Sequence, residues 1–307
     1  MDGDHLRSPV VAEVMRDLVR SERMVGRSLV IAAFGEEGGG GLGLIHEDRI
    51  EVLDRRPGRG VTNCEGTILR IVQRTEGDGG EGFAAPTWLL VATDTMSKET
   101  RTIFAAPDLH DVHCSGDDVF ITAGGDGTVL RCSPDAIGYA MRSGGMATVE
   151  FEVALRTHGI IRGIADDDGR AVVTVSHPGS GQLVDVETGA VLADGLDDPI
   201  AVTRSERAWL ISDLGTNELV IDDDDGRRSV VLGGLGRGMI VRNDVAYVVV
   251  GRPAALRRPA DRRRYRIVIV DLEEGRVVEE QLIPLSRPYT IRSVPTDLAN
   301  ALASSLT

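Results

Sequence analysis

Three arginines, a histidine and a tyrosine recur at equivalent places in six short segments of this 307-residue chain. Each segment reads as one polar, basic or apolar residue, a small residue, and then an apolar residue that opens a run typical of a β-strand. The first positions of the six segments are Arg59, His110, Arg162, Ile200, Arg237 and Tyr289. If the fold gathers these side chains, guanidinium groups can grip a carboxylate or phosphate by forked hydrogen bonds. A histidine beside them can transfer a proton near neutral pH.

The spacing of the segments predicts the elements that position them. The segments start 37 to 52 residues apart, which is the length of four strands and their turns in one blade of a β-propeller. We therefore predict an all-β fold, a six-bladed β-propeller whose innermost strands open with these six positions. Glycine-rich runs at 35–43 and 123–128 join strand to strand, so they indicate turns rather than phosphate loops.

Each end of the chain supplies only part of a blade. Residues 27–54 supply three short strands with no opening segment before them, whereas Tyr289 opens a strand followed only by a polar tail. We expect the C-terminal strand to join the three N-terminal strands in one blade and to close the ring. This gives three regions: an N-terminal helix over 1–26, the propeller over 27–295 and a C-terminal tail over 296–307.

The N-terminal helix is predicted from its end signals. Ser8 suits the N-cap, Pro9 the first helical position and Gly26 the C-terminal stop. Its valines and leucine recur at helical spacing, so we expect an apolar face that packs on the propeller or on a partner.

Composition restricts the class of partner. The formal net charge of −14 argues against general affinity for nucleic acid or for an anionic membrane. The chain has no basic start followed by an apolar run and no stretch near the ~20 apolar residues of a spanning helix. The three cysteines, Cys64, Cys114 and Cys132, lie far apart, and we expect free thiols. These features predict a cytoplasmic protein without nucleic-acid or membrane partners, and a homo-oligomer is compatible with them.

Two interpretations of the arginine ring stay open. In the first, each arginine pairs with a carboxylate of a neighbouring loop, with Asp94, Asp126 and Asp213 as candidates, and the ring holds the blades together. In the second, part of the ring stays free to bind an anion, because converging guanidinium groups repel one another unless negative charge lies between them. The candidate ligand-binding residues are Arg59, Arg162, Arg237, His177 and Asp213.

The densest titratable cluster is His110, Asp111 and His113. Neighbouring strand residues face opposite sides, so we expect Asp111 to share a side with His113 rather than with His110. A structural His–Asp pair is one interpretation, and acid–base catalysis by His110, Asp111 and Tyr289 is the other. A metal site is disfavoured, and the Asp-Asp-Asp-Gly runs near 166 and 222 indicate turns rather than calcium loops.

The insertion over 251–266 carries seven arginines against one aspartate. We expect it either as a solvated or oligomer-contacting loop, or as a lid that draws anions toward the same face as the ring.

Several strings resemble a known family. DLHDVHCSGDDVFIT, GLGRGMIVRNDVAYVVVG and PYTIRSVP are similar to repeats of an uncharacterised bacterial six-bladed β-propeller family whose strand openings read H-D-I, T-R-G-L and E-I-Y-D-I. The chain departs from that pattern at Pro199-Ile200-Ala201 and at Pro288-Tyr289-Thr290. More distantly it is similar to calcium-dependent lactonases and strictosidine-synthase-like propellers, whose metal-binding acidic residues do not map onto these openings.

Together these features predict a protein that binds a small anionic molecule at the mouth of a propeller. As an enzyme it would catalyse acid–base chemistry without a redox cofactor, as a lyase, isomerase, cyclase or hydrolase in specialised metabolism. The alternative is a non-catalytic scaffold, since propellers commonly serve as binding platforms.

Overall fold

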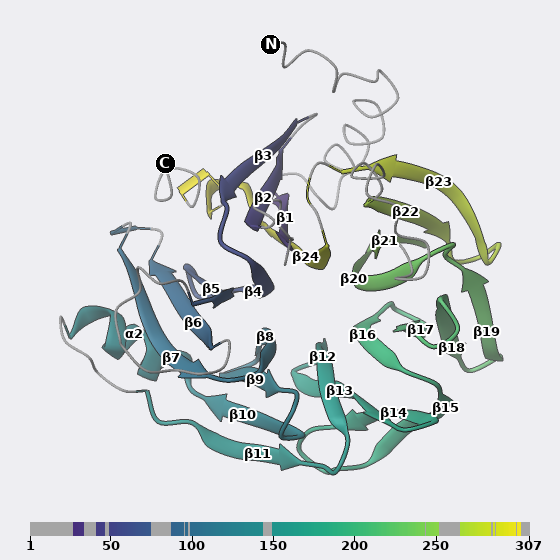
Figure 1. Ribbon diagram of the computed structural model, residues 1–307, viewed down its shortest axis with the longest axis horizontal. Helices are drawn as coiled ribbons and strands as arrows, with labels where there is room; N and C mark the ends of the chain where they lie inside the picture. The colour runs from purple at the N-terminus through teal and green to yellow at the C-terminus, as the bar shows by residue number, and fades with distance from the viewer. Residues whose placement is uncertain are drawn as a thin grey trace.

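Six sheets are arranged around a common axis in the computed structural model (Figure 1). The structure describes residues 27–33, 41–46, 49–74, 87–94, 96–97, 99–143, 149–242, 244–251, 265–283, 285, 287–298 and 300–301. These residues form six four-stranded antiparallel sheets, which confirms the six-bladed β-propeller. The helix expected over 1–26 and the arginines of the 252–264 segment lie outside the described residues.

Five blades are built from consecutive strands, innermost first. Blade 1 is β4 (Gly58–Cys64), β5 (Thr67–Gln73), β6 (Trp88–Asp94) and β7 (Thr100–Ala106). Blade 2 is β8 (Leu109–Ser115), β9 (Asp118–Ala123), β10 (Thr128–Cys132) and β11 (Glu152–Arg156). Blade 3 is β12 (Ile160–Asp167), β13 (Arg170–His177), β14 (Ser180–Asp185) and β15 (Val191–Leu196). Blade 4 is β16 (Pro199–Arg204), β17 (Ala208–Asp213), β18 (Glu218–Asp223) and β19 (Gly226–Val231). Blade 5 is β20 (Leu235–Arg242), β21 (Val245–Gly251), β22 (Arg266–Asp271) and β23 (Arg276–Leu282).

Blade 6 closes the ring with both ends of the chain. Its order is β24 (Pro288–Pro295), β1 (Arg27–Ala33), β2 (Gly41–His46) and β3 (Arg49–Asp54). The innermost strand β24 pairs with β1, with Ile291 opposite Ile31. The predicted closure is therefore confirmed. After β24 the chain is helical over 296–298, and Leu298 packs in the cluster between blades 6 and 1.

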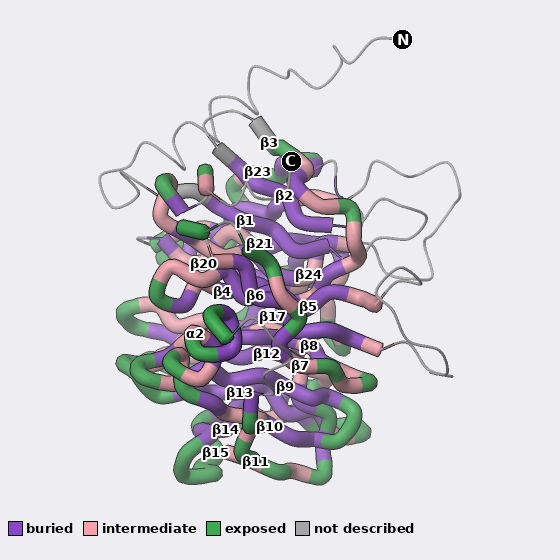
Figure 2. Tube along the Cα trace, turned by 90° about the vertical axis from the view of Figure 1, so that its left-hand side faces the viewer, coloured by how far each residue is buried: buried purple, intermediate pink, exposed green. Residues whose placement is uncertain are grey.

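The core lies between the blades rather than at one centre. In β1, Leu29 and Ile31 pack against residues of blade 5, whereas Val30 packs against blade 1. Both faces of a middle strand are thus buried, which explains why strands such as β1 and β22 read as continuous apolar runs rather than as alternating ones. Figure 2 shows buried residues along the inner and middle strands and exposed residues at the turns; the outermost strands, such as β15 and β19, are also largely exposed.

One helix was not predicted from the sequence. Helix α2 (Pro134–Arg142) lies between β10 and β11, with Ser133 as its N-cap and Pro134 at its start. The Ser133 hydroxyl accepts a hydrogen bond from the Ala136 N–H at 3.2 Å. Its buried side chains, Ile137, Ala140 and Met141, extend the core cluster of blades 1 and 2. In the described part of the chain, no helix combines the length and the apolar character required to cross a bilayer.

The prediction of free thiols is wrong for two cysteines. Cys64 of β4 and Cys114 of β8 form a disulfide, with their Cα atoms 5.6 Å apart. The two residues are 50 positions apart in sequence, and only the side-by-side placement of neighbouring inner strands brings them together. Cys132 is free and buried, and burial raises the pKa of its thiol to about 12.

Candidate functional site

The six opening positions are structurally equivalent. In each blade the pairing of the innermost strand with its neighbour shifts at this place, for example between Gly58 and Val61 or between Leu109 and Val112. The same shift surrounds the other four positions, Arg162, Ile200, Arg237 and Tyr289. A bulge releases a side chain from the regular alternation and turns it in a new direction. We call these six residues the ring.

The residue after each ring arginine is a glycine because the inner strands approach closely there. A Cβ on Gly163 would lie 2.6 Å from the Ile200 carbonyl oxygen. A Cβ on Gly238 would lie 2.5 Å from the Thr290 Cα. The Arg-Gly dipeptides thus combine a side chain for the site with a backbone that lets the next blade pack against it.

Two ring arginines are paired. Arg59 donates from Nη1 to the Asp108 carboxylate at 2.9 Å and to the Leu109 carbonyl at 3.1 Å. Its guanidinium also lies 4.0 Å from the centroid of the Trp88 ring. Arg162 pairs with Asp198 at 2.6 Å. Both partners stand two residues before the ring position of the following blade, so the pairing follows the repeat.

The carboxylates expected to pair with the ring, Asp94, Asp126 and Asp213, do not do so. Asp213 instead accepts hydrogen bonds from the backbone N–H groups of Asp197, Asp198 and Gly215 at 2.8 to 3.0 Å. It therefore holds in place the loop that carries Asp198, the partner of Arg162. Asp94 caps its own turn through the N–H groups of Met96 and Ser97.

Arg237 differs from the other two arginines. By the repeat its partner would stand two residues before Tyr289, and that residue is Arg287. No carboxylate of the described residues pairs with Arg237; its guanidinium lies 5.0 Å from the centroid of the Tyr289 ring. Burial lowers the pKa of Arg237, and the positive charges of Arg287 and Arg162 lower it further. The mouth thus holds a half-buried cation, Arg237, at a place where the repeat has Arg287 instead of a carboxylate.

A chain of hydrogen bonds crosses from blade 2 to blade 6. His110 Nε2 lies 3.1 Å from the Asp108 carboxylate, and His110 Nδ1 lies 2.7 Å from the Tyr289 hydroxyl. Burial lowers the pKa of His110, and Arg59 and Arg162 add to this effect while Asp108 opposes it. Burial alone would raise the pKa of Asp108, but hydrogen bonds from His110 and Arg59 hold it well below its usual range. Burial raises the pKa of Tyr289 against the opposing effect of the neighbouring arginines.

Asp111 lies beneath the ring and not beside His110. Its carboxylate is buried and accepts from Arg292 Nη2 at 3.1 Å, so a residue of β24 reaches across the axis to β8. Burial raises the pKa of Asp111 to about 6, although Arg292 acts in the opposite direction. The two ring nitrogens of His113 are buried, and neither has a hydrogen-bond partner among the described residues. Burial lowers the pKa of His113 to about 4.

The cavity under the ring is small. It is lined by Asp111, Arg162, Arg237, Tyr289 and Arg292 among others, and it has room for about one water molecule. Because Asp111 and Arg292 also line this cavity and leave no more room in it, a ligand larger than water would have to bind outside it, at the mouth.

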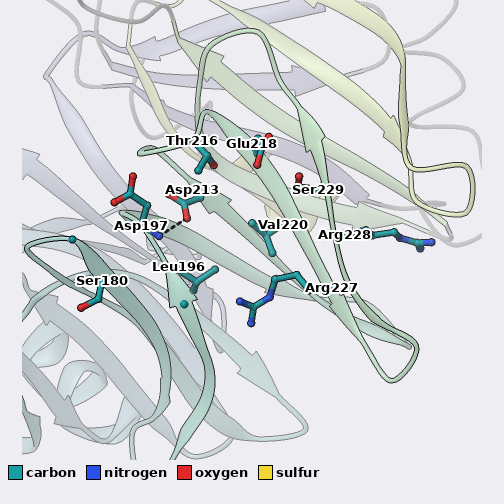
Figure 3. A pocket seen from close by; sticks show the side chains of 12 residues that line it. Ser180, Leu196, Asp197, Asp213, Thr216, Glu218, Val220, Arg227, Arg228 and Ser229 are labelled. Carbon is teal, nitrogen blue, oxygen red and sulfur yellow. Dashed lines mark hydrogen bonds between the residues drawn. The ribbon is translucent and has the colours of Figure 1, made fainter.

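A larger hollow lies between blades 3 and 4 (Figure 3). Its volume is about 440 Å³, and its lining includes Asp197, Asp213, Glu218, Arg227 and Ser229. Both arginines at this groove are already paired. Arg227 donates to the Asp194 carbonyl and, at 2.7 Å, to the Asp222 carboxylate, and Arg228 donates to the Leu272 carbonyl at 2.7 Å. Of the sequence-predicted candidates, Asp213 lies at this groove and not among the ring contacts, and His177 lies at the end of β13, next to Gly159.

The structure thus brings together Arg59, His110, Tyr289 and Arg237. The residues that sequence reasoning missed are Asp108, Asp198, Arg287 and Arg292. The first three could have been found from the sequence, because each stands two residues before a ring position. Arg292 carried no such signal, since its partner lies 181 residues away. Among the described residues, no three His, Cys, Asp or Glu side chains gather as metal ligands would.

Comparison with known proteins shows the fold alone. No known protein family matches the chain, and no curated protein does so either. Among solved structures, the nidogen/laminin complex contains a similar chain, with 13% identity and a TM-score of 0.63 over 88% of this chain and 99% of that one. A protein of unknown function from Bacteroides caccae covers the same shares at 13% identity and a TM-score of 0.57. The PQQ-bound aldose sugar dehydrogenase of Streptomyces coelicolor aligns with 79% of this chain and 97% of its own, at 14% identity and a TM-score of 0.51. All three likenesses support the six-bladed propeller architecture.

Proposed function

We propose that this protein binds a small anionic molecule, a carboxylate or a phosphate, at the mouth of the propeller, with Arg237 as the anchor. The observation that carries the proposal is that one blade has an arginine at the position where two others have an aspartate. Where blades 2 and 4 supply Asp108 and Asp198 to a ring arginine, blade 6 supplies Arg287. Arg237 is half-buried and has no counter-charge among the described residues. Withdrawing a guanidinium from water in this way is costly, and an anionic ligand would supply the missing charge.

The neighbours of Arg237 support binding of an oxyanion. Arg162 and Tyr289 line the same small cavity, so a second positive charge lies close to a ligand bound at Arg237. The guanidinium fork can hold two oxygens of a carboxylate or phosphate at once, which fixes the orientation of the ligand. Arg59 and Arg162 would contribute mainly through their positive field, since their own hydrogen bonds already go to Asp108 and Asp198.

The proposal extends to chemistry on the bound anion. His110 and Tyr289 are hydrogen-bonded to each other at the mouth and could transfer a proton to or from a bound ligand. Such acid–base catalysis moves protons only and therefore needs no redox cofactor. A lyase, isomerase, cyclase or hydrolase step of specialised metabolism fits such a site. Asp213 would act by holding the Asp198 loop and Asp111 by anchoring Arg292, while His177 remains a candidate for ligand contact at the rim. A non-catalytic scaffold is the rival function, favoured by the small size of the cavity under the ring.

The first prediction tests the anchor. Arg237→Ala should weaken the binding of inorganic phosphate or malonate, measured by isothermal titration calorimetry, by about 1.5 to 3 kcal/mol, or roughly ten- to 150-fold. Folding should be retained, because the substitution removes a half-buried cation that has no carboxylate partner among the described residues.

The matched control is Arg131→Ala, which removes one arginine from the exposed outer part of blade 2, where it pairs with Glu152. The control should bind both anions as the wild type does. Equal affinities in Arg237→Ala and the wild type would remove Arg237 as the anchor and leave the scaffold as the better function.

A further inference from the structure

The hydrogen-bond chain at the mouth has the order carboxylate, imidazole, phenol. Asp108 contacts His110 Nε2 at 3.1 Å, and His110 Nδ1 contacts the Tyr289 hydroxyl at 2.7 Å. We propose that Asp108 and His110 are positioning residues that make Tyr289 the catalytic base, and that the substrate is an organic anion with an ionisable C–H or O–H next to its carboxylate. This inference rests on the proposed anion site, which supplies the place of the carboxylate.

The direction of the chain follows from what each group can donate. An ionised carboxylate only accepts, so His110 must place its proton on Nε2, toward Asp108. A neutral imidazole then has an acceptor at Nδ1, and the Tyr289 hydroxyl must be the donor to it. This tautomer leaves the lone pairs of the Tyr289 oxygen available to take a proton from elsewhere.

The chain is held in place by contacts that do not involve a ligand. The Gly124 N–H donates to the Asp108 carbonyl at 3.0 Å, and Arg59 donates to the Asp108 carboxylate. Gly124 also lies against the His110 ring, because a Cβ there would come within 2.4 Å of His110 Cδ2. Glycine at this position therefore lets the imidazole take the orientation that joins Asp108 to Tyr289.

Tyr289 also adjoins the anchor of the anion. The Arg237 guanidinium lies 5.0 Å from the Tyr289 ring centroid, and both residues line the cavity under the ring. A carboxylate bound to Arg237 would thus present its neighbouring atom to Tyr289. The proton of that C–H or O–H would pass to the Tyr289 oxygen as the Tyr289 proton passes to His110 Nδ1. The electron pair stays on the substrate, beside Arg237 and Arg162, and the resulting imidazolium is stabilised by Asp108.

The charges around His110 agree with this step. The groups that face it are Asp108, Arg59, Arg162 and Tyr289. The two arginines and burial keep the imidazole neutral before a ligand arrives. A bound anion offsets part of the arginine charge and so favours the imidazolium that the transfer produces.

The first experiment measures the tautomer without any ligand. In protein labelled with ¹⁵N-histidine, His110 should show a protonated Nε2 and an unprotonated Nδ1 at neutral pH, and Tyr289→Phe should shift the Nδ1 resonance alone. A protonated Nδ1, or a spectrum unchanged by Tyr289→Phe, overturns the inference. Because no anion is added, this result is independent of the proposed function.

The second experiment measures proton exchange on malonate, which carries an acidic CH₂ between two carboxylates. Exchange of this CH₂ in D₂O, followed by ¹H NMR, should be faster with the wild type and slower by roughly 10²- to 10⁴-fold with Tyr289→Phe or His110→Gln, while malonate affinity changes little. His113→Gln is the matched control, since His113 lies in the same strand but below the ring and should leave exchange unchanged.

Each outcome decides a different point. Binding of malonate without accelerated exchange overturns Tyr289 as the base. Binding of phosphate but not of malonate overturns the substrate class. If neither anion binds, the proposed function fails, whereas the hydrogen-bond chain is still judged by the tautomer alone.

Discussion

At the scale of residues, the site illustrates how burial and pairing set the state of a charge. Asp108 and His110 are near neighbours in sequence, yet burial and the adjacent arginines hold the imidazole neutral while hydrogen bonds keep the carboxylate ionised. Below the ring, Asp111 has the opposite charge of Arg292 beside it, whereas the ring nitrogens of His113 have no hydrogen-bond partner in the described part of the chain. Buried groups of this kind link stability to pH, because folding changes their affinity for protons.

A prediction at this scale concerns His113. Its pKa is lowered to about 4 in the folded protein, against about 6.5 in an unfolded chain. Between these values the unfolded chain binds the proton more tightly, so the stability from neutral His113 is present above pH 6.5 and is lost as the pH falls toward 4. This amounts to about 3 kcal/mol at about 1.4 kcal/mol per pH unit.

The measurement is the free energy of unfolding of the wild type and of His113→Gln from pH 7 to pH 4. The wild type should lose stability relative to the variant over this range. Asp111 acts in the opposite direction, but it is present in both proteins and cancels in the difference. Parallel curves would show that His113 does not titrate as a buried neutral group.

At the scale of elements, the inner strands meet two demands at once. The bulge turns the ring arginine toward the mouth, and the glycine that follows it lets the next blade pack closely. Alternate blades use Gly60, Gly163 and Gly238, and the others use Asp111, Ala201 and Thr290. The glycines therefore allow neighbouring blades to pack closely, and the arginines that precede them form the site.

The matching prediction compares two Gly→Ala substitutions. Gly163→Ala should destabilise the protein by about 1 to 3 kcal/mol, because its Cβ would overlap the backbone of Ile200 and Ala201. Gly138→Ala, inside helix α2, should stabilise it by about 0.5 to 1 kcal/mol, because only the flexible end of Arg142 lies nearby. Urea unfolding of both variants provides the test, and equal shifts of the same sign would contradict the close-approach argument.

At the scale of the whole molecule, the ring is closed by one strand from the C-terminus. β24 pairs with β1 along its length and also presents Tyr289 and Arg292 to the axis. A single element therefore closes the fold, carries the catalytic candidate and fills the axis under the site. Loss of closure and loss of the site are the same structural event.

A truncation tests this. Removal of residues 288–307 deletes β24, exposes the edge of β1 and removes the inner strand that packs between β20 and β4, so cooperative thermal unfolding should disappear. Removal of residues 302–307 should have little effect, because the packed Leu298 is retained. A chain without 288–307 that melts like the full-length protein would contradict the role of β24 in closure.

Much of this architecture was determined by the sequence alone. The sequence alone was enough to predict six blades and the strand that closes the ring. Each blade buries both faces against its neighbours, so the same apolar pattern must recur in every blade, and the incomplete blades at the two ends show where the ring closes. The same equivalence identified Arg59, His110, Arg162, Arg237 and Tyr289 as ring members. The Asp-Asp-Asp-Gly run near 166 also predicted a turn, and the left-handed φ angles of Asp168 and Gly169 agree with it.

Only the tertiary structure decided which of these side chains have partners. The Cys64–Cys114 disulfide, the Asp111–Arg292 pair and the contact of His110 with Tyr289 join residues 50, 181 and 179 positions apart. Periodicity indicates which way a strand faces but not which atom of the next blade lies within 3 Å of it. Whether an arginine is paired or free depends on that last distance, and so the choice of Arg237 as the anchor had to come from the folded molecule.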